Sequence, residues 1–221
     1  MKKMLNKYLV ITNSYIDLMK PNILIMVLIT TILGYFLGSD GKILWSNLTW
    51  MLIGTTFSAG GAGVLNQYLE RDQDKIMNRT CNRPIPSGKI SPQNALIFGI
   101  ITVIVGTVIL VVKTNLLTGF LSLLTAFMYV LIYTPMKRVT WLNTSLGSIP
   151  GALPPIGGWA AATNSIDSGA WILFAILYLW QHPHFFAIAW MCKDDYEKAG
   201  FKMLPVIEPD GNRTIRQILW H

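Results

Sequence analysis

Residues 23–38 read ILIMVLITTILGYFLG, a run of sixteen residues without a charged side chain. An α-helix rises about 1.5 Å per residue, so about 20 mostly apolar residues cross the hydrocarbon core of a bilayer. The turn at Lys20 and Pro21 lengthens this run at its start. The stretch therefore predicts a membrane-spanning helix.

Four further stretches have the same character. We expect spans at Leu48–Leu69, Ala95–Val112, Leu116–Tyr133 and Gly169–Trp190. A sixth stretch, Asn143–Ala162, is long enough but rich in Gly and Pro. Irregular backbone persists at membrane depth only beside protein or a cavity, so we interpret it as a broken or tightly packed helix beside a cavity. The alternative is that its small residues only let helices approach closely. The sequence predicts an all-α membrane helix bundle of about six spans, in one domain over residues 1–221.

The composition supports this class. Hydrophobic residues make up 52% of the chain and charged residues 13%, whereas soluble domains carry about 25% charged residues. This excludes an ordinary soluble globule. Cys81 and Cys192 lie far apart and form neither a disulfide framework nor a metal-binding motif. Residues 1–20 are basic and amphipathic but lack the apolar core and cleavage site of a signal peptide, so we expect the first span to remain as an anchor.

The basic residues predict the orientation. Sixteen of the eighteen Lys and Arg side chains precede the first span or follow the second, fourth and sixth, and the opposite connections hold only Lys42 and Lys113. Cytoplasmic loops accumulate Lys and Arg. We therefore expect the amino terminus and every basic loop to be cytoplasmic. The distribution explains the net charge of +7 without nucleic acid as a partner.

Six of the eleven acidic residues fall in two short segments at this same end: Glu70, Asp72 and Asp74, then Asp194, Asp195 and Glu197. Asn66, Glu70 and Asp74 are spaced i, i+4, i+8 and line one stripe of a helix, whereas Asp72 points roughly opposite. Solvated helix ends beside basic neighbours would account for any one of these carboxylates. Two facing carboxylate sets would instead hold Mg²⁺, which proteins usually bind through one or two carboxylates plus substrate phosphates.

A basic set beside the carboxylates completes the pattern. Arg79, Arg83, Lys137 and Arg138 would neutralise a diphosphate. Ordinary inside-positive loop charge is the alternative for each of them. Together the two sets predict a Mg²⁺–diphosphate site at the mouth of a membrane cavity. Such a site would take a lipid-soluble diphosphate and neutralise the charge that develops as the diphosphate departs.

Four motifs carry a family resemblance. Residues 66–83 (NQYLERDQDKIMNRTCNR) resemble the UbiA-type intramembrane prenyltransferases, whose first acidic motif is N-x-x-x-D-x-x-x-D. Residues 133–161 resemble the Y-T-x-x-K-R-x-T-x-x-N and G-x-x-P-P-x-x-G segments of the protoheme IX farnesyltransferase branch. Residues 180–205 resemble its W-x-x-P-H-F and D-Y-x-x-A-G-x-x-M-L-P segments, and DLMKPN at residues 17–22 resembles L-T-K-P-R. These motifs cover nearly the whole chain in family order.

The resemblance implies Mg²⁺-dependent transfer of the farnesyl group of farnesyl diphosphate to a vinyl group of heme b, which gives heme O. It implies a bacterial inner membrane, a site facing the cytoplasm, and heme A synthase or the terminal-oxidase assembly as partners. The implied catalytic residues are Asn66, Glu70, Asp74, Asp194 and Asp195, of which all but Asn66 would bind the metal. The implied substrate-binding residues are Asp72, Arg83, Tyr133, Lys137, Arg138 and His184.

Three features depart from the family pattern. Glu70 replaces the usual Asp, and Asn22 replaces the usual Arg. The family has nine membrane helices, whereas this chain ends at His221 after about six, and residues 213–221 look like the start of the seventh. We therefore expect the last helices to be missing. His184 would contact heme iron or a propionate, with a packed or helix-capping histidine as the alternative, and His182 is interpreted as structural.

Two other functions remain open at this point. The acidic motifs are shared across the family, so the acceptor could be a quinone or chlorophyll precursor. Intramembrane acids and broken helices also occur in transporters, and a transporter or non-catalytic assembly factor is the second alternative. Against it, no clear internal repeat is present and the acidic residues cluster at one side.

Overall fold

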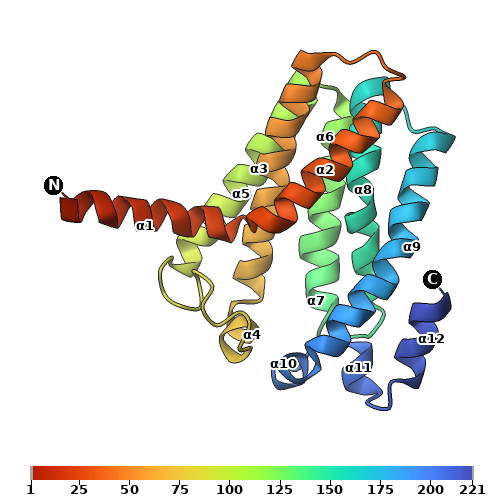
Figure 1. Ribbon diagram of the computed structural model, residues 1–221. Coiled ribbons are helices and arrows are strands. Elements are labelled where there is room, and N and C mark those ends of the chain that lie inside the picture. Colours follow the sequence, from red (N-terminus) through yellow and green to blue (C-terminus); the bar gives the residue numbers. More distant parts are fainter. Residues whose placement is uncertain (1, 221) are drawn as a thin grey trace.

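The computed structural model describes residues 2–220, with side chains from residue 9 onward, and its regular structure in this range is entirely helical (Figure 1). The helices are α1 (Lys2–Leu18), α2 (Pro21–Gly38), α3 (Trp45–Leu69), α4 (Arg71–Ile76), α5 (Pro92–Lys113), α6 (Leu116–Phe127), α7 (Thr134–Met136), α8 (Asn143–Thr163), α9 (Ser168–Met191), α10 (Lys193–Lys198), α11 (Leu204–Ile207) and α12 (Asn212–Trp220). A π-helical segment, η1 (Met128–Tyr133), joins α6 to α7.

Five helical segments in the described chain are long and apolar enough to cross a membrane. They are α2, α3, α5, the continuous segment from α6 to α7, and α9. Each corresponds to one of the five uninterrupted apolar stretches, with ends that differ by at most a few residues. The all-α fold is confirmed, and the protein is an integral membrane protein.

The Gly- and Pro-rich stretch forms one continuous helix, α8. Of the two forms expected for it, broken or tightly packed, the broken form is therefore wrong. Pro150, Pro154 and Pro155 all lie inside this helix. Close packing is confirmed: a Cβ atom built on Gly158 would lie 1.9 Å from the carbonyl oxygen of Thr31 in α2. Helix α8 is not among the five segments that are apolar enough to cross a membrane alone. It packs against its neighbours α2, α6 and α9.

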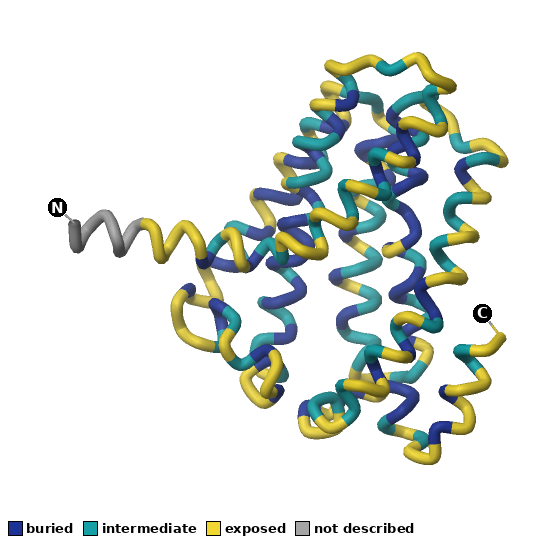
Figure 2. The backbone as a smooth tube through the Cα atoms, viewed as in Figure 1, coloured by how far each residue is buried: buried dark blue, intermediate teal, exposed yellow. Residues whose placement is uncertain are grey.

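Side chains from neighbouring segments bond the C-terminal end of α8. Asn47 Nδ2 donates to the carbonyl of Ala161 at 3.0 Å, and Asn115 Nδ2 donates to that of Ala160 at 2.8 Å. The last carbonyls of a helix have no partner within the helix. Asn47 supplies one for Ala161, and Ala160 also accepts from the Asn164 amide at 2.8 Å. Buried residues accordingly concentrate along α8 and α3, in the middle of the bundle (Figure 2).

Helix α1 projects sideways from the bundle, and α2 starts in a new direction at Pro21 (Figure 1). The turn between them depends on Lys20, whose φ of 56° lies in the left-handed region that non-glycine residues seldom adopt. Leu18 is fully buried beside it, and Gln67 Nε2 donates to the Leu18 carbonyl at 3.0 Å. This anchored turn fixes where the Lys20 side chain points.

Candidate active site

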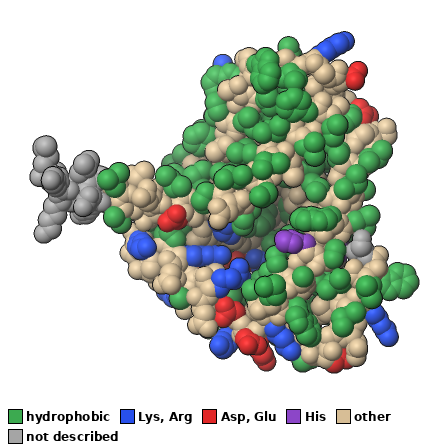
Figure 3. Space-filling model, in the orientation of Figure 1, with side chains coloured by type: hydrophobic (Ala, Val, Ile, Leu, Met, Phe, Trp, Pro, Cys, Tyr) green, Lys and Arg blue, Asp and Glu red, His purple; other side chains and the backbone are tan. Residues whose placement is uncertain are grey.

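A cavity of about 630 Å³ lies between α2, α3, the α6–α7 segment, α8 and α9. Most of its wall is apolar, and charged side chains gather at the end where α4 and α10 lie. Figure 3 shows this hollow: its interior is hydrophobic, Lys, Arg, Asp and Glu side chains cluster below it, and a histidine borders it. The volume is in the range of pockets that bind small organic ligands.

The first acidic motif lines the charged end of the cavity. Helix α3 ends at Leu69, but the Glu70 amide still bonds the Asn66 carbonyl at 3.0 Å and the Asp74 amide bonds the Glu70 carbonyl at 2.8 Å. The helical spacing therefore continues into α4. Asn66, Glu70 and Asp74 are 1%, 6% and 0% exposed and all line the cavity. The predicted shared stripe is confirmed.

Each of the two carboxylates in this stripe is paired with a basic side chain. Lys137 Nζ lies 2.7 Å from Glu70 Oε1, and Arg83 Nη1 donates to both Asp74 oxygens at 2.9 and 2.8 Å. Burial alone would raise the pKa of Glu70, but the charges of Lys137 and Lys20 outweigh it and hold that pKa below its usual value. Burial alone would likewise lower the pKa of Lys137, but Glu70 raises it. Both groups of this pair are therefore charged.

Lys20 belongs to the same cluster. Its Nζ lies 2.5 Å from Asn66 Oδ1 and 3.4 Å from the Tyr129 hydroxyl. Burial, reinforced by the positive charge of Arg83, lowers the pKa of Lys20 to about 7. The sequence indicates Lys20 only as a residue of the turn before the first span and as one of the inside-positive charges, not as a site residue. The sequence feature that could have indicated Lys20 as a site residue is its place in the family-like segment DLMKPN (residues 17–22), whose Asn22 also lines the cavity.

The π-helical segment places two tyrosines beside these charges. Pro135 has no N–H to bond the residue four positions earlier, and the amide of Thr134 instead bonds the Tyr129 carbonyl five positions back. The rings of Tyr129 and Tyr133 then stack with centroids 5.8 Å apart, and Lys137 Nζ lies 4.6 Å from the Tyr133 centroid. Tyr133 and Lys137 thus lie at the cavity, as the resemblance implies.

The second acidic motif reaches the same end of the bundle but is arranged differently. Asp195 Oδ1 and Oδ2 accept hydrogen bonds, both at 3.2 Å, from the backbone amides of Asn78 and Arg79, just after α4. Asp194 is exposed. The two acidic segments therefore meet. Asp195, however, bonds the backbone of the loop after α4 instead of facing Glu70 and Asp74.

Two other residues expected at the site lie outside the cavity wall. Asp72 is exposed and lies 3.8 Å from Arg71 and 3.9 Å from Lys75, on the opposite side of α4 from Asp74. Arg138 is exposed. Among residues 9–220, no three acidic, His or Cys side chains are placed to hold a metal ion together. The four expected metal ligands are thus not assembled. Glu70 and Asp74 alone fit Mg²⁺ shared with a diphosphate, because one or two carboxylates suffice for that arrangement.

The two histidines of α9 differ in environment. His184 lines the cavity, and its ring stacks on Trp180 with centroids 5.0 Å apart. His182 is 1% exposed, with Nδ1 2.8 Å from the Tyr178 carbonyl and Nε2 3.2 Å from the Ser145 hydroxyl. His184 is therefore available to a ligand, and His182 packs α9 against α8.

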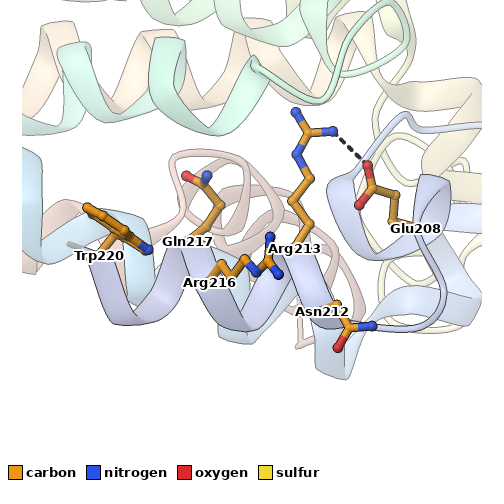
Figure 4. A pocket seen from close by; sticks show the side chains of 6 residues that line it. All are labelled: Glu208, Asn212, Arg213, Arg216, Gln217 and Trp220. Atoms are coloured by element: carbon orange, nitrogen blue, oxygen red, sulfur yellow. Dashed lines mark hydrogen bonds and ion pairs between the residues drawn. The ribbon is translucent and has the colours of Figure 1, made fainter.

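A second hollow, of about 590 Å³, lies along α12. Figure 4 shows Arg213 turned toward Glu208 and Asn212 on another side of the helix. Arg213 Nη1 lies 2.6 Å from Glu208 Oε1. The Arg213 guanidinium also lies 4.3 Å from the Trp141 ring centroid. These contacts hold α12 against its neighbours. The acidic stripe and the apolar chamber lie in the larger cavity, which is the candidate active site.

Known proteins are similar to this chain in sequence or in fold. The model of the UbiA prenyltransferase family matches residues 27–221. The protoheme IX farnesyltransferase of Solibacter usitatus is 45% identical over 93% of this chain and 73% of its own length. That of Salinibacter ruber is 45% identical over 93% of this chain and 72% of its own. Among solved structures, a UbiA homologue from Archaeoglobus fulgidus bound to DMAPP and Mg²⁺ superposes with a TM-score of 0.76 at 16% identity, covering 93% of this chain and 73% of its own.

Proposed function

This chain belongs to the UbiA prenyltransferase family, and we propose that it transfers the farnesyl group of farnesyl diphosphate to a vinyl group of heme b, forming heme O. The observation that carries the proposal is the acidic stripe of Asn66, Glu70 and Asp74 at the charged end of an otherwise apolar cavity. A diphosphate with a long hydrocarbon tail matches a cavity that is charged at one end and apolar along the rest of its wall. The curated relatives at 45% identity are named for the same reaction.

Mg²⁺ is the proposed cofactor, held by Glu70 and Asp74 and by the diphosphate itself. When bound, it neutralises the charge that develops on the departing diphosphate. Arg83 and Lys137, which pair with these carboxylates, would turn their N–H groups to the diphosphate oxygens, and Lys20 would do the same from α2. Asp195 would act by fixing the loop after α4, since its oxygens bond that backbone.

The apolar part of the cavity would hold the farnesyl chain and keep bulk water away from the allylic carbon. The exposed stack of His184 and Trp180 at the cavity wall is the proposed contact for the heme. We further propose that the basic end of the bundle faces the cytoplasm of a bacterial inner membrane. The product would then pass to heme A synthase or to the terminal-oxidase assembly.

The reaction is tested by incubating membranes that contain the protein with farnesyl diphosphate, heme b and Mg²⁺. We expect heme O by mass spectrometry, and no heme O after EDTA, because Glu70 and Asp74 repel a diphosphate unless a divalent cation lies between them. A parallel incubation with 4-hydroxybenzoate tests the alternative acceptor. Prenylation of 4-hydroxybenzoate but not of heme b would overturn the proposed acceptor. Transfer to neither would favour the transporter or assembly factor.

Lys20→Met is expected to weaken Mg²⁺-dependent binding of inorganic diphosphate about tenfold, since a hydrogen bond to a charged group contributes roughly 1.5–3 kcal/mol. The measurement is calorimetry in detergent. Lys42→Met is the matched control, because Lys42 lies in the connection at the opposite end of the bundle. Equal affinity in wild type and Lys20→Met would remove Lys20 from the diphosphate site.

A further inference from the structure

Gln181 is a buried polar residue in the wall of the cavity that the mechanism above does not use. It lies on α9, is 6% exposed, and faces Ser148 and Gly151 of α8. His184 follows one helical turn later and lines the same cavity. A buried carboxamide needs hydrogen-bond partners, so the direction of each of its two polar atoms is informative.

The amide nitrogen of Gln181 is fixed by two carbonyl groups. Nε2 lies 3.0 Å from the Leu177 carbonyl and 3.5 Å from the Ser148 carbonyl. Because carbonyl oxygens only accept hydrogen bonds, these contacts identify which end of the carboxamide is nitrogen. The other end, Oε1, lies beside Gly151, where a Cβ atom would be only 1.9 Å away. No hydrogen bond from residues 9–220 reaches Oε1.

The contacts of α8 indicate how far Gln181 lies from the charged end of the cavity. Gly147, one turn before Gly151, packs against the ring of Tyr133, and Lys137 Nζ lies 4.6 Å from the centroid of that ring. One turn of helix corresponds to about 5.4 Å. Oε1 is therefore close to one turn beyond the charged end, where the first carbons of a diphosphate-anchored prenyl chain would lie.

Three hydroxyl groups in the cavity wall are already engaged. The hydroxyls of Thr31 and Thr125 donate to carbonyls of their own helices, and Ser122 donates to Ser58. Gln181 Oε1 differs because it is a strong acceptor that no donor among residues 9–220 reaches. An acceptor of this kind orients a water molecule through one O–H and leaves the water's lone pairs directed elsewhere.

We propose that Gln181 is a positioning residue that holds the water which hydrates the reaction intermediate, an inference that rests on the proposed function. The C1–O bond of farnesyl diphosphate breaks and its electron pair leaves with the diphosphate. The vinyl π pair forms the new carbon–carbon bond, which leaves a cation on the other vinyl carbon. The oxygen of the held water bonds to that carbon, and the water's proton passes to the released diphosphate.

The product distribution tests this role. Without a held water, the cation loses a proton instead and gives an alkene lighter than heme O by one water. Gln181→Met keeps the size of the side chain but removes the acceptor. We expect the ratio of alcohol to alkene, measured by mass spectrometry, to fall about tenfold, while total farnesylated heme changes less.

Two further variants separate positioning from packing. Gly151→Ala leaves Gln181 in place but displaces Oε1, and should lower the same ratio. Gln181→Glu retains an acceptor oxygen and should keep the ratio near that of wild type. Gln67→Met is the matched control, since Gln67 is a buried amide that bonds the Leu18 carbonyl outside the cavity wall. It should leave the ratio unchanged even if it lowers stability.

The outcomes distinguish the two levels of the proposal. An unchanged ratio in both Gln181→Met and Gly151→Ala would overturn the role of Gln181 while leaving farnesyl transfer intact. A ratio that falls equally in Gln67→Met would also overturn it, because the effect would then follow from destabilisation. If wild type forms no farnesylated heme, the proposed function fails and the inference fails with it.

Discussion

Asp74→Ala is expected to reduce farnesyl transfer at least about a thousandfold, because loss of a metal ligand removes several kcal/mol of transition-state stabilisation. Asp74 is the most buried carboxylate of the site, at 0% exposed. The change also leaves Arg83 without the partner to which Nη1 donates at 2.8 and 2.9 Å. The measurement is the initial rate of heme O formation with saturating farnesyl diphosphate and Mg²⁺.

Loss of folding has to be separated from loss of chemistry. Removing one partner of a buried ion pair costs about 3–5 kcal/mol of stability, so Asp74→Ala could be inactive for that reason alone. Asp74→Asn keeps the shape and one acceptor for Arg83, and it should remain folded in detergent but stay inactive. Asp210→Ala, in the exposed turn before α12, is the control and should retain wild-type activity. A folded Asp74→Asn with near-normal activity would contradict the metal assignment.

The parts of the structure that the sequence predicts well depend on local physics. A bilayer requires a minimum apolar length, so α2 and α5 could be located from composition alone. The stripe of Asn66, Glu70 and Asp74 could be predicted because one helical spacing runs through α3 into α4. Asp72 pointing away follows from the same geometry.

The parts that the sequence does not predict depend on contacts between distant segments. Lys20 enters the site because a left-handed turn directs it to Asn66, 46 residues later. Asp195 turns to the backbone of Asn78 and Arg79, which no spacing in α10 specifies. Helix α8 remains continuous through three prolines because its neighbours pack closely around it, and hydropathy contains no information on that packing.

Gly158→Ala is expected to be the most destabilising small substitution in the bundle. A Cβ at Gly158 would lie 1.9 Å from the Thr31 carbonyl oxygen and 2.8 Å from the Tyr35 amide nitrogen. Both are backbone atoms of α2, so no side chain can move aside to relieve the clash. Gly34 shows the reciprocal contact, with its Cβ position 2.0 Å from the Pro155 carbonyl oxygen. Overpacking costs about 1–3 kcal/mol, which corresponds to a fall in Tm of up to about 10 °C in detergent.

The neighbouring glycine provides the matched control for this contact. A Cβ built on Gly157 meets nothing within 4 Å, so Gly157→Ala should change the Tm by less than about 2 °C. Separation of α2 from α8 should also impair diphosphate binding in Gly158→Ala, because Lys20 precedes the first residue of α2 and depends on that helix for its position beside Asn66. Equal melting temperatures for the two alanine variants would show that α2 and α8 are not in backbone contact, and the cavity wall between them would need a different packing.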